Sequence, residues 1–266
     1  MRYLNFKEND LPANLEVPGC VYSKRFLNEY AKPVGFCAME NGDGNKNFLV
    51  VGNSFACNQA DLIYTTFKQH IKQFNVFCYY GCEVMTWTPD VKCWRRVNYI
   101  AMVQALRPDV VFVMSRSLMA KASFNTMKTI DEDRIFRDHL WKMTVFEKIV
   151  KKVYLLQALP SCIDSCSVEA QKFTDTGRPL RDIQEGLIKR DDFFARQRIQ
   201  EVGKRCRTCE IIDYLPVLVD GNGRYLGYNP ENNLLYLDDH NHFTRFGKER
   251  LQVLFNQLVK DFNVSN

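Results

Sequence analysis

The sequence lacks any long apolar run, and no stretch approaches the ~18 consecutive apolar residues that a membrane-spanning helix needs. Its first residues, MRYLNFKENDLPANLEV, are polar, so no signal peptide is visible. The sequence also lacks a large excess of charge of one sign, because its 36 lysines and arginines are nearly balanced by 31 aspartates and glutamates. The basic clusters Lys148–Lys152 and Lys204–Arg207 are too short for a nucleic-acid footprint, and a solvated helix face explains them. Nucleic-acid binding is therefore not expected.

Histidine is scarce, with four residues in a chain of 266, and two of the four stand close together near the C-terminus. The remaining composition is that of a globular protein, since 46% of the residues are hydrophobic and 25% are charged. A chain of this length forms one large domain or at most two small ones.

Cysteine, by contrast, is abundant. The close pairs Cys162/Cys166 and Cys206/Cys209 and an even total favour disulfides in an oxidising compartment. One Cys₄ zinc site built from those two pairs is the alternative, but it leaves six cysteines without a role. An oxidising compartment and a polar N-terminus together lead us to expect that a lumenal or extracellular chain of this kind is a piece of something longer. The ten cysteines are Cys20, Cys37, Cys57, Cys78, Cys82, Cys93, Cys162, Cys166, Cys206 and Cys209.

Short apolar runs alternate with segments of helical periodicity, which predicts a parallel sheet covered on both faces. We expect an α/β fold, a three-layer flavodoxin-like sandwich with a central, mostly parallel five-stranded sheet over residues 47–266, after an irregular N-terminal extension over residues 1–46. Ligands of such folds bind at the carboxyl ends of the strands. The predicted strands are Asn47–Val51, Asn75–Tyr79, Val110–Met114, Val153–Gln157 and Glu210–Asp213, and the predicted helices are 57–74, 94–106, 131–150, 191–204 and 243–262.

Ser54 follows the first predicted strand directly, in the stretch Val50-Val-Gly-Asn-Ser-Phe-Ala56. An α/β fold presents a nucleophile at this place, where the N–H groups of the next helix can hold an oxyanion. Gly52 allows a tight turn, and Asn53 tolerates a left-handed conformation. A simple helix cap at Ser54 is the alternative interpretation.

A second polar stretch, Tyr236-Leu-Asp-Asp-His-Asn-His-Phe-Thr244, precedes the last predicted helix. Asp239 and His242 have the spacing Asp-x-x-His, which allows the carboxylate to orient the imidazole while its other nitrogen faces a hydroxyl. A solvated polar loop is one alternative. A metal site formed by Asp238, Asp239, His240 and His242 is another, although no further cluster of ligands accompanies it.

Together these stretches resemble the SGNH (GDSL-type) hydrolase superfamily, and more closely the SGNH domain of acyltransferase-3-type O-acyltransferases in their animal, nematode-like versions. Each block is weak alone, but the ordered set spans most of the chain. The blocks that carry the resemblance are Pro33–Cys37, Leu49–Ala56, Pro108–Met114, Asp213–Pro216 and Leu237–Gly247.

The resemblance implies that Ser54 is the nucleophile, His242 the general base and Asp239 its orienting partner. It places the oxyanion hole at the backbone N–H groups of Ser54 and Gly81. Phe243 and Thr244 after His242 match the family's His-Leu-Ser/Thr, so His242 is preferred over His240.

Two positions depart from the family pattern. Asn53 stands where an aspartate is usual. The asparagine of the third block is not evident, and Ser115 or Arg116 is the candidate that replaces it.

The predicted function is therefore a serine-dependent O-acyltransferase or esterase domain without a cofactor or metal. Its partners are an acyl donor and a hydroxyl acceptor, in a carbohydrate or a lipid by family analogy. An acyltransferase-3 membrane domain in a longer product would be a further partner, and the domain would then lie on the lumenal or extracellular face of a membrane. The alternative is a non-catalytic binding domain that has kept the fold, and a cytosolic metalloprotein is a more distant one.

Overall fold

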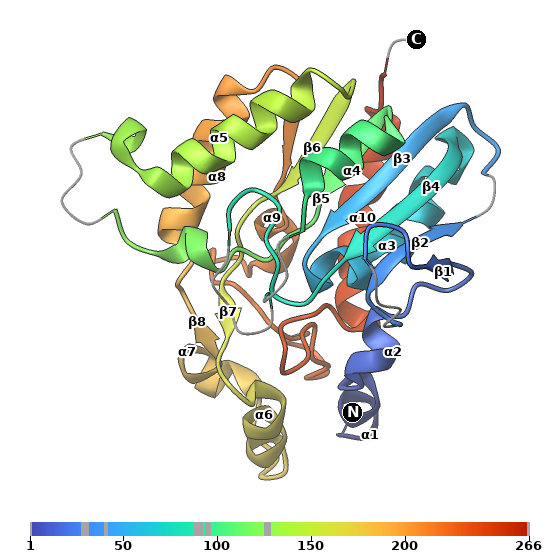
Figure 1. Ribbon diagram of the computed structural model, residues 1–266. Helices are drawn as coiled ribbons and strands as arrows, with labels where there is room; N and C mark the ends of the chain where they lie inside the picture. The colour runs from blue at the N-terminus through green and yellow to red at the C-terminus, as the bar shows by residue number, and fades with distance from the viewer. Residues whose placement is uncertain are drawn as a thin grey trace.

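The central sheet of the protein is mostly parallel, as the apolar runs predict (Figure 1). The computed structural model describes residues 2–27, 32–39, 42–87, 93, 97–124 and 129–264. Within these residues, seven strands pair in the order β1-β2-β4-β3-β5-β6-β9. The strands β4, β3, β5, β6 and β9 are mutually parallel, whereas β1 and β2 add to the β4 edge in antiparallel pairs. The parallel part has the flavodoxin-like order 2-1-3-4-5 when its strands are numbered along the chain.

The elements alternate along the chain as a doubly wound fold requires. The strands are β1 Val21–Ser23, β2 Gly35–Met39, β3 Lys46–Gly52, β4 Ile71–Cys78, β5 Val110–Val113, β6 Lys152–Leu156, β7 Ser161–Cys162, β8 Ile188–Lys189 and β9 Cys209–Ile212. The α-helices are α1 Arg2–Glu8, α2 Leu11–Leu15, α3 Ser54–Phe67, α4 Tyr99–Leu106, α5 Arg134–Glu147, α6 Cys166–Thr174, α7 Gln184–Leu187, α8 Phe193–Arg205, α9 Leu215–Leu218 and α10 Arg245–Lys260. The 3₁₀ turns are η1 Lys68–His70, η2 Met119–Lys121, η3 Ile130–Glu132 and η4 Leu180–Ile183.

The five predicted strands are the five parallel strands of the sheet, with shifted ends. β4 begins four residues before the predicted start, because the preceding helix ends at Phe67 and not at Phe74. Ile71 and Phe74 continue the helical spacing in sequence, but η1 turns the chain into the sheet before them. The helix predicted over residues 94–106 is α4, and residues 94–96 lie outside the described part of the chain.

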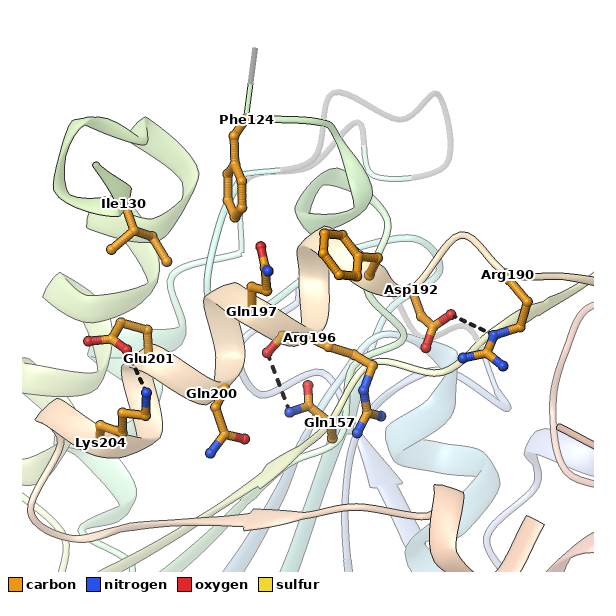
Figure 2. A pocket seen from close by; sticks show the side chains of 11 residues that line it. Phe124, Ile130, Gln157, Arg190, Asp192, Arg196, Gln197, Gln200, Glu201 and Lys204 are labelled. Atoms are coloured by element: carbon orange, nitrogen blue, oxygen red, sulfur yellow. Dashed lines mark hydrogen bonds and ion pairs between the residues drawn. The ribbon is translucent and has the colours of Figure 1, made fainter. Parts of the chain in front are cut away.

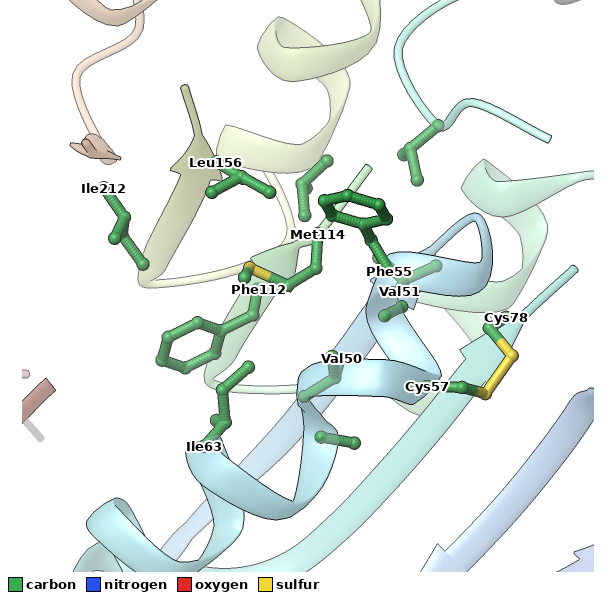
Figure 3. Close-up of a cluster of buried hydrophobic side chains, with 14 of the residues drawn as sticks. Val50, Val51, Phe55, Cys57, Ile63, Cys78, Phe112, Met114, Leu156 and Ile212 are labelled. Carbon is green, nitrogen blue, oxygen red and sulfur yellow. A yellow bond between two sulfur atoms is a disulfide. The ribbon is translucent and has the colours of Figure 1, made fainter. Parts of the chain in front are cut away.

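Helices cover both faces of the sheet. The helices α3 and α10 pack together on one face, and α4, α5 and α8 pack together on the other. Figure 3 shows how α3 lies on the sheet, with Ile63 directed toward Phe112 and Val50. Phe55, at the start of the helix, lies beside Met114 in the same view. All five side chains are buried, and each contributes ~1.5–3 kcal/mol to folding. This packing fixes the start of α3, where Ser54 lies.

The prediction of an irregular extension over residues 1–46 is wrong. Two helices and two strands form within the described part of this range, and β1 and β2 extend the sheet. The sequence does not predict β1, because its three residues are exposed or half-buried and form no apolar run. Figure 1 shows α1 and α2 at the same end of the molecule as α6, opposite the C-terminus.

The cysteines form disulfides, as predicted, rather than a zinc site. The pairs within the described residues are Cys20–Cys37, Cys57–Cys78, Cys82–Cys93, Cys162–Cys166 and Cys206–Cys209. The Cys57–Cys78 disulfide joins the first turn of α3, which begins at Ser54, to the end of β4 (Figure 3). None of the helices in the described part of the chain combines the length and the apolar character needed to cross a bilayer.

Candidate functional site

The turn between β3 and α3 places Ser54 at the carboxyl edge of the sheet. A Cβ atom on Gly52 would lie 2.0 Å from the carbonyl oxygen of Met114, so only glycine permits this close approach of β3 to the end of β5. Asn53, not Ser54, caps α3, because its Oδ1 accepts the backbone N–H of Phe55 at 3.2 Å. The alternative of Ser54 as the helix cap is thereby excluded, and the hydroxyl of Ser54 is directed elsewhere.

Ser54 Oγ lies 2.8 Å from His242 Nε2. The two residues are 188 positions apart in the chain, and His242 is almost fully buried while Ser54 is partly exposed. His240 is exposed, and its ring stacks against that of His242 at 6.2 Å between centroids. The structure thus brings Ser54 and His242 together, and places His240 at the rim.

The carboxylate beside His242 is Asp238 and not Asp239, which corrects the predicted Asp-x-x-His pairing. Asp238 Oδ2 lies 3.2 Å from His242 Nδ1, and the backbone N–H of Asp238 donates to the carbonyl of His242 at 2.9 Å. The two residues therefore face each other at the end of a hairpin. The next pair along its two arms, Leu237 and Phe243, forms an antiparallel β-bridge. Residues 239–241 form the loop.

The geometry of this loop explains why Asp238, and not Asp239, pairs with His242 across the hairpin. The N–H of Asn241 donates to the carbonyl of Asp238 at 3.0 Å, and Asn241 has a φ of 67°. A turn followed by a left-handed residue is the usual form of a three-residue hairpin loop. Such a loop aligns positions four apart, so the spacing that matters here is Asp-x-x-x-His.

Asp238 is buried, yet it is held as a carboxylate. Its Oδ1 accepts the N–H groups of His240 and His242, both at 2.8 Å, and its Oδ2 accepts Asn14 Nδ2 at 3.0 Å. Burial alone raises the pKa of the Asp238 carboxyl, but the hydrogen bond and charge of His242 and the other donors outweigh it, so that this pKa is lowered. An ionised Asp238 fixes the His242 tautomer with its proton on Nδ1.

Asp239 points away from the imidazole, toward the N-terminal helices and α6. Its Oδ2 accepts Asn9 Nδ2 at 2.9 Å, and its Oδ1 accepts the backbone N–H of Ser167 at 2.8 Å. These contacts give Asp239 the role of holding the tip of the hairpin. The repeated aspartate made the two positions equivalent in the sequence, and only the backbone pairing separates them.

Asn58 is a site residue that the sequence analysis missed. It lies on α3 one turn after Ser54 and is fully buried. Its side chain accepts the N–H of Phe243 at 2.9 Å and donates to the Phe243 carbonyl at 3.0 Å. The helix that carries Ser54 is therefore clamped directly to the residue next to His242. A polar side chain four residues after Ser54, on the inward face of a helix, was the available signal.

Ser54 and His242 open into a pocket of about 270 Å³. Gly81, predicted as an oxyanion donor, lines the same pocket and has a φ of 66°. That positive φ explains why glycine occupies the position. Ser54 is the first residue of α3, where a backbone N–H has no acceptor within the helix.

Arg116 and Ser115 are separated by the structure. Arg116 lines the pocket, whereas Ser115 is buried and its Oγ has no partner among the described residues. The Arg116 guanidinium donates to Ser161 Oγ at 2.8 Å, and Asp191 accepts from that hydroxyl at 2.8 Å. Burial lowers the pKa of Arg116, and the charge of Asp191 opposes this shift. Of the two predicted substitutes, only Arg116 brings a cation to the site.

A larger hollow of about 780 Å³ lies along α8 (Figure 2). Figure 2 shows α8 side chains such as Gln197 and Gln200 along it, with Phe124 above Gln197. No serine or histidine is among the described residues that line it. The described residues also contain no group of three or more His, Cys, Asp or Glu side chains arranged for a metal ion. Of these two pockets, the smaller one holds the contact between Ser54 and His242.

Known proteins share this architecture. The model of a family described as "SGNH domain (fused to AT3 domains)" matches residues 19–257. The periplasmic domain of a lipopolysaccharide acetyltransferase from Salmonella ser. Paratyphi A is similar in structure, with a TM-score of 0.59 and 12% identity over 82% of this chain and 84% of that one. At this identity the likeness concerns the fold.

Two further solved structures align over most of this chain with lower scores. A putative acylhydrolase from Bacteroides fragilis has a TM-score of 0.44 and 16% identity over 84% of this chain and 90% of its own. A putative platelet activating factor structure from Streptococcus pneumonia has a TM-score of 0.43 and 13% identity over 96% of this chain and 94% of its own. No curated protein matches the sequence.

Proposed function

The chain belongs to the family of SGNH domains that are fused to AT3 domains, and on this premise we propose that it transfers acyl groups through a serine ester. Ser54 is the proposed nucleophile, His242 the general base and Asp238 the carboxylate that orients it. The observation that carries the proposal is the 2.8 Å contact of Ser54 Oγ with His242 Nε2, opposite an Nδ1 atom that faces a buried carboxylate.

In the first step Ser54 Oγ attacks the carbonyl carbon of an acyl ester, and its proton moves to His242 Nε2. Asp238 stabilises the imidazolium that forms, because its Oδ2 lies 3.2 Å from Nδ1. The alcohol then leaves with the proton from Nε2, and the acyl group stays on Ser54. The proton that Ser54 gave up thus departs with the alcohol, and His242 is neutral again.

The oxyanion of the tetrahedral intermediate needs donors on the side of the pocket opposite the imidazole. We assign the backbone N–H groups of Ser54 and Gly81 to this task, supported by the start of α3 at Ser54 and by the place of Gly81 in the pocket wall. Arg116 supplies positive charge in the place where the family has a third-block asparagine.

A hydroxyl acceptor then attacks the acyl-Ser54, and His242 takes its proton. The bond between Ser54 Oγ and the acyl carbon breaks, and Nε2 returns the proton to Oγ, which restores the free serine. Water in place of the acceptor makes the same site an esterase. The small pocket favours a short acyl chain, and a pocket open to solvent admits a carbohydrate or lipid hydroxyl. We further propose that an AT3 membrane domain supplies the acyl group and that this domain works on the lumenal or extracellular side, where its disulfides are stable.

Labelling with a fluorophosphonate probe tests the proposal. The wild type should label at Ser54, located by peptide mass spectrometry, and Ser54→Ala and His242→Ala should lose the label. Ser115→Ala and His240→Ala are the matched controls, since Ser115 lies outside the pocket wall and His240 lies at its rim. A folded wild type that does not label, beside a serine hydrolase that does, would favour a non-catalytic binding domain.

A further inference from the structure

The N-terminal segment, residues 2–18, precedes the stretch that the family model matches, yet it lies against the proposed site. Asn9 pairs with Asp239 through both side-chain atoms, donating to Oδ2 at 2.9 Å and accepting the backbone N–H at 3.0 Å. Asn5 forms a similar pair with the chain before the hairpin, at Leu235 and Asn233. A row of asparagines thus fastens this segment along residues 233–239.

Asn14 differs from the others because it reaches the carboxylate that faces His242. Within the described part of the chain, the Asp238 carboxylate has four polar contacts, and three of them come from its own hairpin, namely the N–H groups of His240 and His242 and the His242 ring. Asn14 Nδ2, at 3.0 Å from Oδ2, is the contact from outside. It bonds the same oxygen that faces the imidazole. With Asp238 1% exposed, water has little access to replace it.

Asn14 is itself fixed on both sides. Its amide also donates to the carbonyl of Glu8 at 2.7 Å, which orients the side chain. Its own carbonyl accepts Asn58 Nδ2 at 3.0 Å, and Asn58 is the buried residue of α3 that clamps Phe243. The main chain of Asn14 is therefore tied to the helix of the nucleophile, and its side chain to the carboxylate.

We propose that Asn14 is a positioning residue of the acyl-transfer site, and that the N-terminal segment is thereby an integral part of it. The inference rests on the proposed function. Asn14 holds Asp238 Oδ2 in line with His242 Nδ1, so that Nε2 stays aimed at Ser54. Leu11, in the same segment, lines the pocket and places this segment at the substrate as well.

The first test compares Asn14→Ala with Asn5→Ala. Both remove an asparagine that fastens the segment, but only the first touches Asp238. We expect the fluorophosphonate labelling rate of Asn14→Ala to fall about ten- to a hundredfold, since a hydrogen bond to a charged group is lost and the site loosens. Asn5→Ala should label within about threefold of the wild type. Melting temperatures of both variants show whether they fold.

The second test uses a charge. Asn14→Asp places a carboxylate against Asp238, so the labelling rate at neutral pH should be lower than that of Asn14→Ala. The ratio of these two rates should rise as the pH is lowered toward 5, because one proton relieves the repulsion. The ratio of Asn5→Asp to Asn5→Ala should stay flat. The hairpin contributes three further titratable groups near Asp238, namely Asp239, His240 and His242. Arg116 interacts with Asp238 through its charge, and Asp164 lines the same pocket. On the side of Asn14, Asp10 caps α2, and Glu8 pairs with Arg245.

A measurement without chemistry separates this inference from the proposed function. The ring ¹⁵N signals of His242 report its tautomer and its bond to Asp238 whether or not Ser54 reacts. Asn14→Ala should shift these signals and Asn5→Ala should not. The positioning role is overturned if the Asn14 variants match their Asn5 counterparts in labelling rate, in the pH dependence of that rate and in the ring ¹⁵N signals of His242. If the wild type does not label but the His242 signals still depend on Asn14, only the proposed function fails.

Discussion

Asp238 and His242 face each other across a hairpin loop of three residues, with Oδ2 of the one 3.2 Å from Nδ1 of the other. The loop carries strain at a single residue, Asn241, whose φ is 67°. Asparagine tolerates this conformation better than other non-glycine residues, and its Oδ1 also accepts the N–H of Cys162. The spacing of the proposed catalytic pair thus depends on a residue that takes no part in the chemistry.

Replacing Asn241 tests this dependence. Asn241→Gly keeps the backbone conformation and loses the contact with Cys162, whereas Asn241→Val loses both. We expect the valine variant to be less stable than the glycine variant by about 1–2 kcal/mol, because a β-branched residue resists a positive φ. Chemical unfolding of the two variants measures the difference. Equal stabilities would show that the loop does not need its left-handed residue.

Asn53 is a second position where the residue type follows from its contacts. Its Oδ1 accepts the N–H of Arg116 at 3.1 Å, and its Nδ2 donates to the carbonyl of Arg116 at 2.8 Å. An aspartate accepts but cannot donate, so Asn53→Asp should leave that carbonyl without its partner. We predict a loss of about 1–3 kcal/mol in the free energy of unfolding at pH 7.

Thermal unfolding and labelling should be measured together for Asn53→Asp. Because the turn carries Ser54 and holds Arg116 at the pocket, the labelling rate should fall with the stability. Asn53→Gln, which keeps both groups on a longer side chain, is the steric control. An Asn53→Asp variant as stable as the wild type would mean that the hydrogen bond from Asn53 Nδ2 to the Arg116 carbonyl does not contribute to the free energy of unfolding.

His139 predicts how stability depends on pH. It is fully buried on α5, neither ring nitrogen has a partner among the described residues, and burial followed by the charge of Arg198 lowers its pKa to about 3. In the unfolded chain His139 binds a proton near pH 6.5, whereas in the folded chain it stays neutral down to about pH 3. The free energy of unfolding therefore falls as the pH drops from 6.5 toward 3. By pH 5 the loss reaches about 2 kcal/mol.

His139→Leu should remove this slope between pH 6.5 and 5. Carboxyl groups of lowered pKa, such as Asp238, weaken the fold only below about pH 4, so they do not obscure the window. Urea unfolding at a series of pH values measures the slope, with the exposed His240→Ala as control. A slope that persists in His139→Leu would place the acid sensitivity elsewhere.

The sheet and the turn that carries Ser54 could be predicted from the sequence because both depend on local patterns. Buried parallel strands such as Val110–Val113 are continuous apolar runs, and segments of helical periodicity alternate with them along the chain. Ser54 needs only to follow one of these strands. His242 stands out in the sequence because it follows an aspartate at the spacing Asp-x-x-His and because the Phe-Thr after it matches the family block.

The remaining parts of the site depend on contacts that a linear pattern does not encode. Asp238 and Asp239 are neighbours of one type, and the hairpin register that separates them comes from the turn at Asn241. Asn14 lies 224 positions from Asp238, in a polar stretch with no apolar periodicity to predict its docking. The sequence contains these residues, but only the packing of the N-terminal segment brings them together.

The most direct test of the account compares Asp238→Asn with Asp239→Asn in the rate of fluorophosphonate labelling at Ser54. Asp238→Asn replaces the carboxylate on His242 Nδ1, and a substitution of this kind in a serine triad lowers the rate by as much as about 10⁴-fold. Asp239→Asn should label within about tenfold of the wild type, since its contacts are with Asn9 and Ser167. The reverse order, with Asp239→Asn inactive and Asp238→Asn reactive, would contradict the assignment.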